Sequence, residues 1–486
     1  MMRNISMDDV VVGTSIPARA TAPASAGDGW QENYAYSLGM QAYVWGFPWI
    51  YNAQLRWLWT TKEGQKVSQQ AHKPDLYAPV NSFHRSQQLA SPENSKSGGS
   101  PNCDTLYATA WLDVTHDPIV ISVPAVTDRF YCIEMVCMDA DNFAYVGTRS
   151  TGTQAGNYLI AGPGWTGAVP DDVLDVLPRS RTVSIFLLGR TGVNDQTQAD
   201  LDKANAIQAQ YQLTPLSLWP NTPPPTPSHV LVPDGFDYNH TAGAWRTMNA
   251  AMTQDPPGLP PGIAQDQLLK LFATVGIGPG QDVERQSEAT RAGLQRAARD
   301  GLAMLQSMAK GHGKQINGWT YPPLDLGRAG QSSDYITRGA LQSLAGICAN
   351  DPAEAVYINA FSDSLGQQLN GNSYYRIMFG AGDFPPCDVT RHGFWSITMY
   401  NADYNLVEGS AHYTINGYCP AYQDRDAAGG MTILIQNADP GSLPLGTYWL
   451  QSPADGTFYL ILRVYVPDPQ VSVTQTWAPP EIVRLP

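Results

Sequence analysis

The sequence predicts a mainly β protein with helical additions: two jelly-roll-like antiparallel β-sandwiches, an N-terminal helical segment and a helical insert. Segments in which apolar and polar residues alternate cluster in two regions, 101–152 and 394–466. The 38 Pro and 44 Gly residues supply many turns, and the charged share of 15% is low for a helical bundle. At 486 residues the chain is also too long for one ordinary core, so we expect several domains.

Composition and pattern divide the chain into five predicted parts. The parts are a flexible arm at 1–29, N-terminal helices at 30–79, a first β-sandwich domain at 80–215, a Pro-rich crossing and helical insert at 216–354, and a second β-sandwich domain at 355–486. The arm is rich in Ala, Ser, Gly and Pro, which is typical of mobile termini. The Pro-rich stretch 214–235 gives the clearest boundary by composition.

The N-terminal part is predicted to be helical and aromatic. A helical pattern covers Asn33 to Trp59, and Pro48 is expected to kink or split it. The following stretch, 80–99, is predicted to be a loop.

Four strands are predicted within the first β domain. In Leu106 to Val114, alternate residues are apolar, as expected for a strand with one buried face. Further strands are expected at 119–123, 129–139 and 142–148, separated by turns rich in Pro, Gly and Asp. Two more strands and a helix follow at 158–160, 182–189 and 199–211.

Helical patterns return after the Pro-rich stretch, and strands follow them. Helices are predicted at 243–252, 266–275, 282–310 and 335–349, of which the third carries an apolar stripe at helical spacing. Four strands of the second β domain are expected at 394–400, 412–416, 431–436 and 457–466.

Net charge excludes two classes of partner. The formal charge is −14 and the isoelectric point is near 4.9, so the phosphates of nucleic acid and anionic membrane surfaces would be repelled. There is no apolar run of 18 residues and no signal-peptide pattern at the N-terminus, so we expect a soluble, cytoplasmic protein. The six Cys include no C-x-x-C pair and are expected to be reduced thiols.

No familiar cofactor or metal motif occurs in the sequence. The eight His are scattered without an H-x-H or H-E-x-x-H pair, which argues against a metal site. No G-x-S-x-G, phosphate-binding loop or G-x-G-x-x-G following a strand is found. We therefore expect neither a metal nor a cofactor.

The remaining candidates for chemistry are carboxylate, phenol and guanidinium groups. We predict that Asp104, Tyr107 and Arg149 are catalytic: Asp as base, Tyr as acid, and Arg binding an anionic substrate. We expect them to lie near Asp139 in the first β domain. The structural alternative is that Asp104 caps a turn and Arg149 forms an ion pair.

A second group is predicted to bind substrate. Arg463 and Tyr465 are two residues apart on one strand face, and the buried Arg requires a partner, for which a carboxylate across the seam between the domains would serve. The complete predicted substrate-binding set is Arg129, Tyr131, Trp395, Tyr400, Arg463 and Tyr465.

Several long motifs carry a family resemblance. The motifs are PNCDTLYATAWLD (101–113), DRFY (128–131), VGTRSTG (146–152), GFWSITMYNADYNLV (393–407) and DGTFYLILRVYVP (455–467). The first three resemble domain-of-unknown-function family 1254, and the last two resemble family 1214. The resemblance implies two β-rich, jelly-roll-like domains with helical additions, often assembled as oligomers, and it indicates no particular activity. Tyr448 and Gln451 stand where the second family usually has Asn and Pro.

Three functions stay open at this point. The first is a metal-independent enzyme of hydrolase, lyase or isomerase type. Its substrate would be a small organic compound, and both an anionic and an aromatic compound are open. The second is a protein that binds carbohydrate or aromatic ligands, favoured by 13 Trp and 24 Tyr. The third is a structural homo-oligomer without catalysis.

Overall fold

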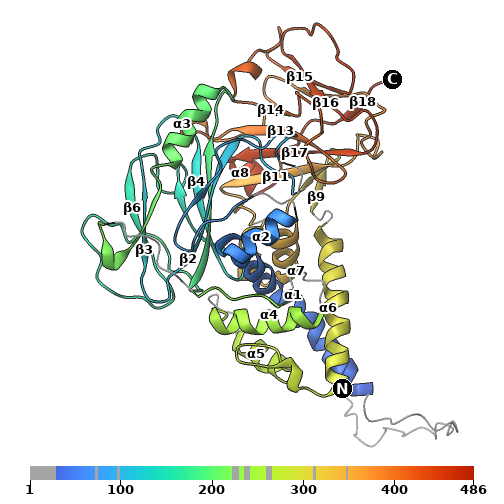
Figure 1. The fold of residues 1–486 in the computed structure, drawn as a ribbon. Coiled ribbons are helices and arrows are strands. Elements are labelled where there is room, and N and C mark those ends of the chain that lie inside the picture. Colours follow the sequence, from blue (N-terminus) through green and yellow to red (C-terminus); the bar gives the residue numbers. More distant parts are fainter. Residues whose placement is uncertain are drawn as a thin grey trace, which may run out of the picture.

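The computed structural model describes residues 29–71, 75–95, 99–221, 229–234, 241–258, 265–309, 313–345 and 348–486. Two β units and a group of helices make up the molecule (Figure 1). The fold is mainly antiparallel β-sheet with an N-terminal helix, as the sequence predicts. Of the predicted arm, only Gly29 lies within the described residues.

The first β unit packs two sheets on an apolar core. The five-stranded sheet has the order β1 (His84–Arg85), β2 (Thr105–Asp113), β7 (Ser184–Gly192), β4 (Tyr131–Cys137) and β5 (Asn142–Gly147). The three-stranded sheet has the order β6 (Gly156–Ile160), β3 (Ile119–Val123) and β8 (Gln212–Pro215). Alternate residues of β2 and β4, such as Ala108 and Ile133, point into this core.

The second β unit is also a pair of sheets. The larger has the order β14 (Thr414–Asn416), β13 (Trp395–Asn401), β17 (Phe458–Tyr465), β11 (Ala355–Ala360), β10 (Trp319–Tyr321) and β9 (Lys314–Ile316). The smaller has the order β16 (Thr447–Gln451), β15 (Met431–Gln436), β12 (Tyr375–Phe379) and β18 (Val483–Arg484). The pairings between the named strands are antiparallel except that of β15 with β16.

Two strands of the second unit lie in the segment predicted as a helical insert. β9 and β10 form a hairpin whose turn is Asn317-Gly318, with φ of 52° and 81°. Asn-Gly with positive φ at both positions is the preferred two-residue hairpin turn. This part of the insert therefore belongs to the second β unit.

Eight α-helices occur among the described residues. They are α1 (Gly29–Thr60), α2 (Lys62–Gln70), α3 (Gln198–Gln208), α4 (Thr241–Gln254), α5 (Gln265–Ala273), α6 (Glu288–Ala309), α7 (Tyr335–Gly339) and α8 (Pro469–Ser472). In place of the helix predicted at 335–349, α7 passes into a π-helical turn, Ala340–Leu344. None of the described helices is long and apolar enough to cross a membrane.

Helix α1 runs through Pro48 without a break, contrary to the expectation that proline would split it. The rings of Trp45 and Trp49 stack with their centroids 5.3 Å apart, and both side chains are buried together with Pro48. The helix lies against α6 so closely that a Cβ added at Gly39 would be 2.7 Å from Cβ of Ala297. This packing stabilises the helix enough to offset the backbone hydrogen bond that is lost at proline, which has no N–H group.

The outer face of the five-stranded sheet is divided into two halves. One half is apolar and packs on α1 through Trp111, Val136 and Phe186. The other half carries Glu134 and Arg190, with Tyr107 at its border with the helical core. Ring contacts of Phe130 with Phe394 and Tyr465 join this half to the second β unit. We call this polar region between the two units the seam.

Candidate functional site

Two rows of side chains lie across the sheets that meet at the seam. In the first unit, Tyr107 is paired with Arg190, and Arg190 with Cys132. In the second unit, the row is Tyr357, Arg463, Ser396 and Asn416, each paired with the next across neighbouring strands. Residues paired in this way point to the same face of a sheet, so each row presents its polar groups together.

Aromatic and charged contacts join the two rows. The ring of Phe130, from the first unit, lies 5.1 Å from that of Tyr465 and 5.8 Å from that of Phe394. The Arg463 guanidinium interacts electrostatically with Tyr107, and Arg190 with Tyr357. The seam is therefore a shared buried environment of the two units.

Asp104 directly precedes β2 and is fully buried in the seam. One carboxylate oxygen accepts a hydrogen bond from Ser396 Oγ at 2.5 Å, and the other from Asn416 Nδ2 at 2.9 Å. Burial raises the pKa of Asp104, although both hydrogen bonds and Arg463 oppose it. Asp104 therefore joins the two units through Ser396 and Asn416, and its charge interacts with that of Arg463.

Arg463 is 3% exposed and holds a central position. Its Nη2 donates to the carbonyl of Ser100 at 2.9 Å, and its guanidinium lies 5.5 Å from the ring centre of Tyr400. Burial alone would lower the pKa of Arg463, but Tyr400, Tyr465 and Asp104 outweigh burial and raise it. Its Nη1 has no hydrogen-bond partner among the described residues.

Glu134 and Arg190 form a buried ion pair on the first unit. Arg190 Nη1 donates to Glu134 Oε2 at 2.7 Å and to Asn350 Oδ1 at 3.2 Å. Asn350 in turn donates to the hydroxyl of Tyr357 at 2.6 Å. Burial raises the pKa of Glu134 to about 7, against the opposing effect of Arg190. Glu134 Oε1 has no partner among the described residues.

The predicted catalytic residues Tyr107 and Arg149 lie at the edges of this pair. The Tyr107 ring is 5.9 Å from the Arg190 guanidinium, and its side chain is half-buried. Arg149 is 24% exposed and donates through Nε to Oε2 of the fully buried Glu354 at 2.5 Å. Burial raises the pKa of Glu354, and its Oε1 has no partner in the described part of the chain.

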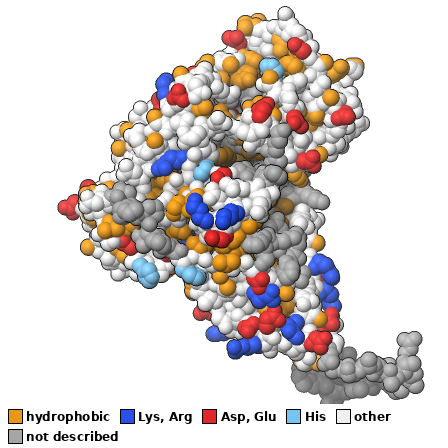
Figure 2. All heavy atoms as spheres, in the orientation of Figure 1, with side chains coloured by type: hydrophobic (Ala, Val, Ile, Leu, Met, Phe, Trp, Pro, Cys, Tyr) orange, Lys and Arg blue, Asp and Glu red, His pale blue; other side chains and the backbone are white. Residues whose placement is uncertain are grey.

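The seam thus has the components for proton transfer. Glu134 Oε1, Glu354 Oε1 and Arg463 Nη1 are three of the twenty buried side-chain polar atoms without a hydrogen-bond partner in the described part of the chain, and they lie together at the seam. Half-buried Tyr107 and Tyr357 adjoin them. Figure 2 shows a recess between the two β units, above α2. No group of three or more His, Cys, Asp or Glu among the described residues is arranged to hold a metal.

Three predicted site residues lie outside the seam. Arg129 pairs with Asp200 of α3 at 2.9 Å and anchors that helix. Tyr131 is buried in the core of the first unit, where it donates to the carbonyl of Gly152 at 3.3 Å. Trp395 is buried in the core of the second unit, 5.4 Å from the ring of Phe379.

The alternation of side chains along a strand explains the positions of Tyr131 and Trp395. Tyr131 lies between Phe130 and Cys132, so it points to the opposite face, away from the seam. The same alternation directs Trp395 away from the face that carries Ser396. The sequence shows which residues share a face but does not show which face meets the other unit.

The residues that sequence reasoning missed are mostly charged or polar groups in apolar surroundings. They are Glu134, Arg190, Asn350, Glu354, Tyr357, Ser396 and Asn416. Glu134 and Arg190 could have been found, because each is the one charged residue of a strand, β4 or β7, that is buried along its whole length. A charged side chain in a fully buried strand requires a partner.

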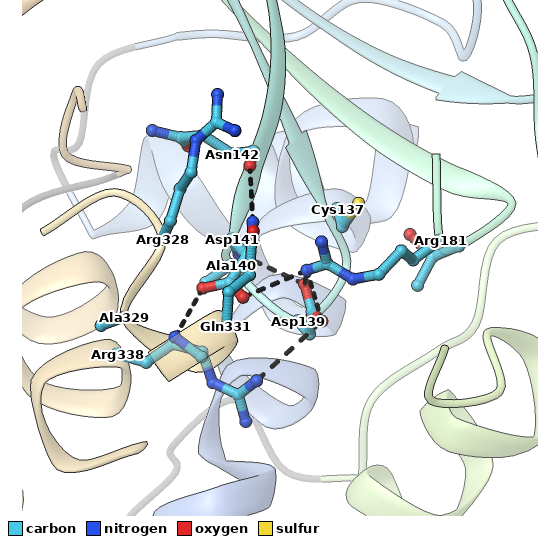
Figure 3. Close-up of polar contacts among 12 residues, drawn as sticks. Cys137, Asp139, Ala140, Asp141, Asn142, Arg181, Arg328, Ala329, Gln331 and Arg338 are labelled. Atoms are coloured by element: carbon cyan, nitrogen blue, oxygen red, sulfur yellow. Dashed lines mark hydrogen bonds and ion pairs between the residues drawn. The ribbon is translucent and has the colours of Figure 1, made fainter. Parts of the chain in front are cut away.

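Asp139, expected near Asp104, belongs to a separate cluster with Asp141, Arg181 and Arg338 (Figure 3). We call these four residues the aspartate knot. Arg181 Nη2 lies 2.9 Å from Asp139 Oδ2 and 3.1 Å from Asp141 Oδ2, and the backbone N–H of Gly330 donates to Asp141 Oδ1 at 2.9 Å. These bonds tie the turn after β4 to Arg181 and Gly330.

The two carboxylates of the aspartate knot respond differently to burial. Burial acts to raise the pKa of Asp139, but Arg181 and Arg338 outweigh it, and the pKa is lowered. Burial and the charge of Asp139 together raise the pKa of Asp141 to about 7. The knot therefore holds one carboxylate strongly ionised beside another that protonates more easily.

Two family models match the chain. Residues 80–215 match the family described as "Protein of unknown function (DUF1254)", and residues 354–469 match "Protein of unknown function (DUF1214)". The two domains occur in the order that the sequence motifs indicate. No curated protein matches the chain.

Two solved structures are similar to this one. The VPA0106 protein from Vibrio parahaemolyticus is 21% identical, with 93% of this chain and 100% of that chain covered and a TM-score of 0.67. This similarity supports the fold alone. An uncharacterized protein from Burkholderia cenocepacia is 12% identical, with 83% and 80% covered and a TM-score of 0.41, which is too low to bear on the fold.

Proposed function

Starting from a chain that carries a DUF1254 domain followed by a DUF1214 domain, we propose that it is a metal-independent enzyme. The proposed reaction is proton transfer on a small organic substrate with an anionic group, of hydrolase, lyase or isomerase type. The observation that carries the proposal is the set of buried, unpartnered atoms in the seam: Glu134 Oε1, Glu354 Oε1 and Arg463 Nη1.

Glu134 is the proposed proton acceptor. Its pKa of about 7 is close to an ordinary working pH, at which a carboxyl can both accept and release a proton. Arg190 fixes its Oε2, which leaves Oε1 for the substrate. A perturbed carboxyl beside a specific charged partner is a frequent property of active sites.

Tyr107 and Arg463 have complementary roles in this proposal. Tyr107 is the proton donor, because its phenol is half-buried and two guanidinium groups interact with it. Arg463 Nη1 binds the anionic group of the substrate, since a guanidinium pairs well with a carboxylate. Asp104 is a positioning residue that orients Arg463, and Arg149 orients Glu354 at the edge of the seam.

The experiment is an untargeted turnover assay with a matched pair of variants. The purified protein is incubated with a cellular extract of small molecules, and mass spectrometry follows consumption and product formation. Tyr107→Phe and Tyr131→Phe each remove one phenol hydroxyl, the first in the seam and the second in the core of the first unit.

We expect the wild type and Tyr131→Phe to convert the same compound and Tyr107→Phe to be slower by about 100-fold or more. Conversion by Tyr107→Phe at the wild-type rate would contradict the proposed site. The absence of conversion by the wild type, with retention of a bound compound, would instead indicate a binding protein.

A further inference from the structure

We propose a second binding site, for a neutral ligand rich in hydroxyl groups such as a simple sugar, in a pocket of the second β unit. The pocket has a volume of about 340 Å³. This volume lies within the range of roughly 300–1,000 Å³ common for small-molecule sites. The polar residues that line it are Asn401, Glu408, Ser410, Asn437, Gln451 and Ser452.

The pocket forms where the two sheets of the second unit end. Asn401 is the last residue of β13 in the larger sheet, and Gln451 is the last residue of β16 in the smaller one. Asn437 follows β15 directly. Ser396 of the seam is five residues from Asn401 on β13, so the pocket is about 16 Å from the seam along this strand.

The pocket wall offers both donors and acceptors. Oδ1 of Asn401 accepts hydrogen bonds from the backbone N–H groups of Asp403 and Asn405, both at 3.0 Å, which leaves its amide nitrogen as a donor. The amide nitrogens of Asn437 and Gln451 donate to the carbonyls of Ser452 and Asn437, which leaves their side-chain oxygens as acceptors.

A buried hydroxyl adds an independent indication of a ligand. Ser452 is fully buried, and its Oγ has no hydrogen-bond partner among the described residues. Buried hydroxyls are normally paired, so a bound polar molecule would satisfy this one. The wall therefore matches hydroxyl groups, which donate and accept at once.

Charge in the pocket selects against anions. Glu408 is the charged residue of the lining, which contains no Lys or Arg among the described residues. An anionic ligand would be left without a cationic partner beside a carboxylate. This chemistry is unlike that of the seam, where Arg190 and Arg463 favour an anion, so the two sites are distinct.

The test is ligand-observed NMR with methyl α-D-glucopyranoside as the neutral probe and sodium gluconate as the anionic one. Ala454 lines the pocket and is exposed, so Ala454→Trp should fill the entrance without removing a polar group. Ala427 is also exposed and lies outside the lining, which makes Ala427→Trp the matched control.

We expect the neutral probe to bind the wild type and Ala427→Trp alike, with affinity at least about tenfold lower in Ala454→Trp. Gluconate should bind more weakly than the neutral probe. Failure of the neutral probe to bind at millimolar concentration, or binding that Ala454→Trp does not weaken, would overturn the proposal. Equal binding of gluconate would overturn the selectivity.

A second variant tests the polar wall itself. Asn401→Asp keeps the oxygen that accepts from Asp403 and Asn405 but replaces the donating amide nitrogen with an acceptor. Loss of one hydrogen bond should weaken binding of the neutral probe by about fivefold. Unchanged affinity would remove Asn401 from the site, and unchanged affinity in Ala454→Trp as well would exclude the pocket.

Discussion

The seam and the aspartate knot are both buried clusters of arginine and carboxylate, yet they differ in how completely their carboxylates are paired. In the knot, all four oxygens of Asp139 and Asp141 accept a hydrogen bond. In the seam, Glu134 and Glu354 each keep one oxygen without a partner among the described residues.

In the function proposed above, this difference separates a structural role for the knot from a chemical role for the seam. A carboxylate with a hydrogen bond to each oxygen is held in place by the protein, whereas Glu134 and Glu354 each have one buried oxygen without a bond among the described residues. The pKa does not separate the clusters, because that of Asp141 and that of Glu134 are both raised to about 7. The two clusters therefore differ in the pairing of their carboxylate oxygens, since Arg181 Nε and Arg338 Nε in the knot, like Arg463 Nη1 in the seam, have no partner among the described residues.

Breaking the knot should give the largest loss of stability. Arg181→Met leaves two buried carboxylates without their main partner, since Arg181 contacts both Asp139 and Asp141. Removing one partner of a buried ion pair costs about 3–5 kcal/mol, so we expect the free energy of unfolding to fall by that amount. Chemical denaturation monitored by tryptophan fluorescence measures it.

The control for this variant is Arg179→Met. Arg179 pairs with Asp175, and their side chains are 30% and 34% exposed. An exposed ion pair contributes about 0–1 kcal/mol, so the stability should change little. A similar fall in the free energy of unfolding in both variants would show that the aspartate knot stabilises the fold no more than an exposed ion pair does.

Glu134→Gln should change how stability depends on pH. Because the pKa of Glu134 is raised from 4.5 to about 7 in the fold, the native state holds its proton more tightly than the unfolded chain does. The stability that this proton contributes is complete below about pH 4.5 and is lost as pH rises through about 7. The side-chain amide of Glu134→Gln does not titrate, so the stability of this variant does not fall in this way as pH rises.

The free energy of unfolding of Glu134→Gln should therefore rise relative to the wild type between pH 4.5 and 8, by up to about 3 kcal/mol. Denaturation curves at several pH values measure the difference. A difference that is constant across this range would show that Glu134 has an ordinary pKa and would remove the main argument for its role as base.

Asp104→Asn should have the smallest effect of the three. Asn keeps an oxygen that can accept from Asn416 Nδ2, but the negative charge beside Arg463 is lost. We expect a loss of about 1–3 kcal/mol in the free energy of unfolding. Asp113→Asn, on the same strand and half-buried, is a useful comparison because its ion pair with Arg56 is long, at 3.5 Å. An unchanged stability in Asp104→Asn would contradict the role of Asp104 in joining the units.

Local sequence signals predicted much of the fold. The strands 119–123 and 431–436 were predicted to the residue, because Pro or Gly bounds each of them closely. The short strands β1, β8, β9, β10, β16 and β18 were not predicted, since two to five residues give too little periodicity, and β1 lies in the stretch predicted to be a loop. The Asn317-Gly318 turn was the one local signal that would have located β9 and β10.

The grouping of residues at the seam was predictable only in part. Six of the nine predicted residues meet at the seam: Asp104, Tyr107, Arg149, Tyr400, Arg463 and Tyr465. The partners Glu134 and Arg190 are separated by 56 residues along the chain and are joined only by the pairing of β4 with β7. Such pairing, and the choice of which sheet face meets the other unit, depend on tertiary packing that no local pattern encodes.

The most direct test of the account compares one carboxylate from each cluster by turnover per folded molecule. Glu134→Gln and Asp139→Asn each replace one buried carboxylate with an amide, and the compound that the wild type converts is the substrate. We predict that Glu134→Gln stays folded and loses turnover by about 100-fold or more, while Asp139→Asn is less stable and keeps its turnover. The reverse result, with turnover kept in Glu134→Gln and lost in folded Asp139→Asn, would contradict the assignment of the seam as the site.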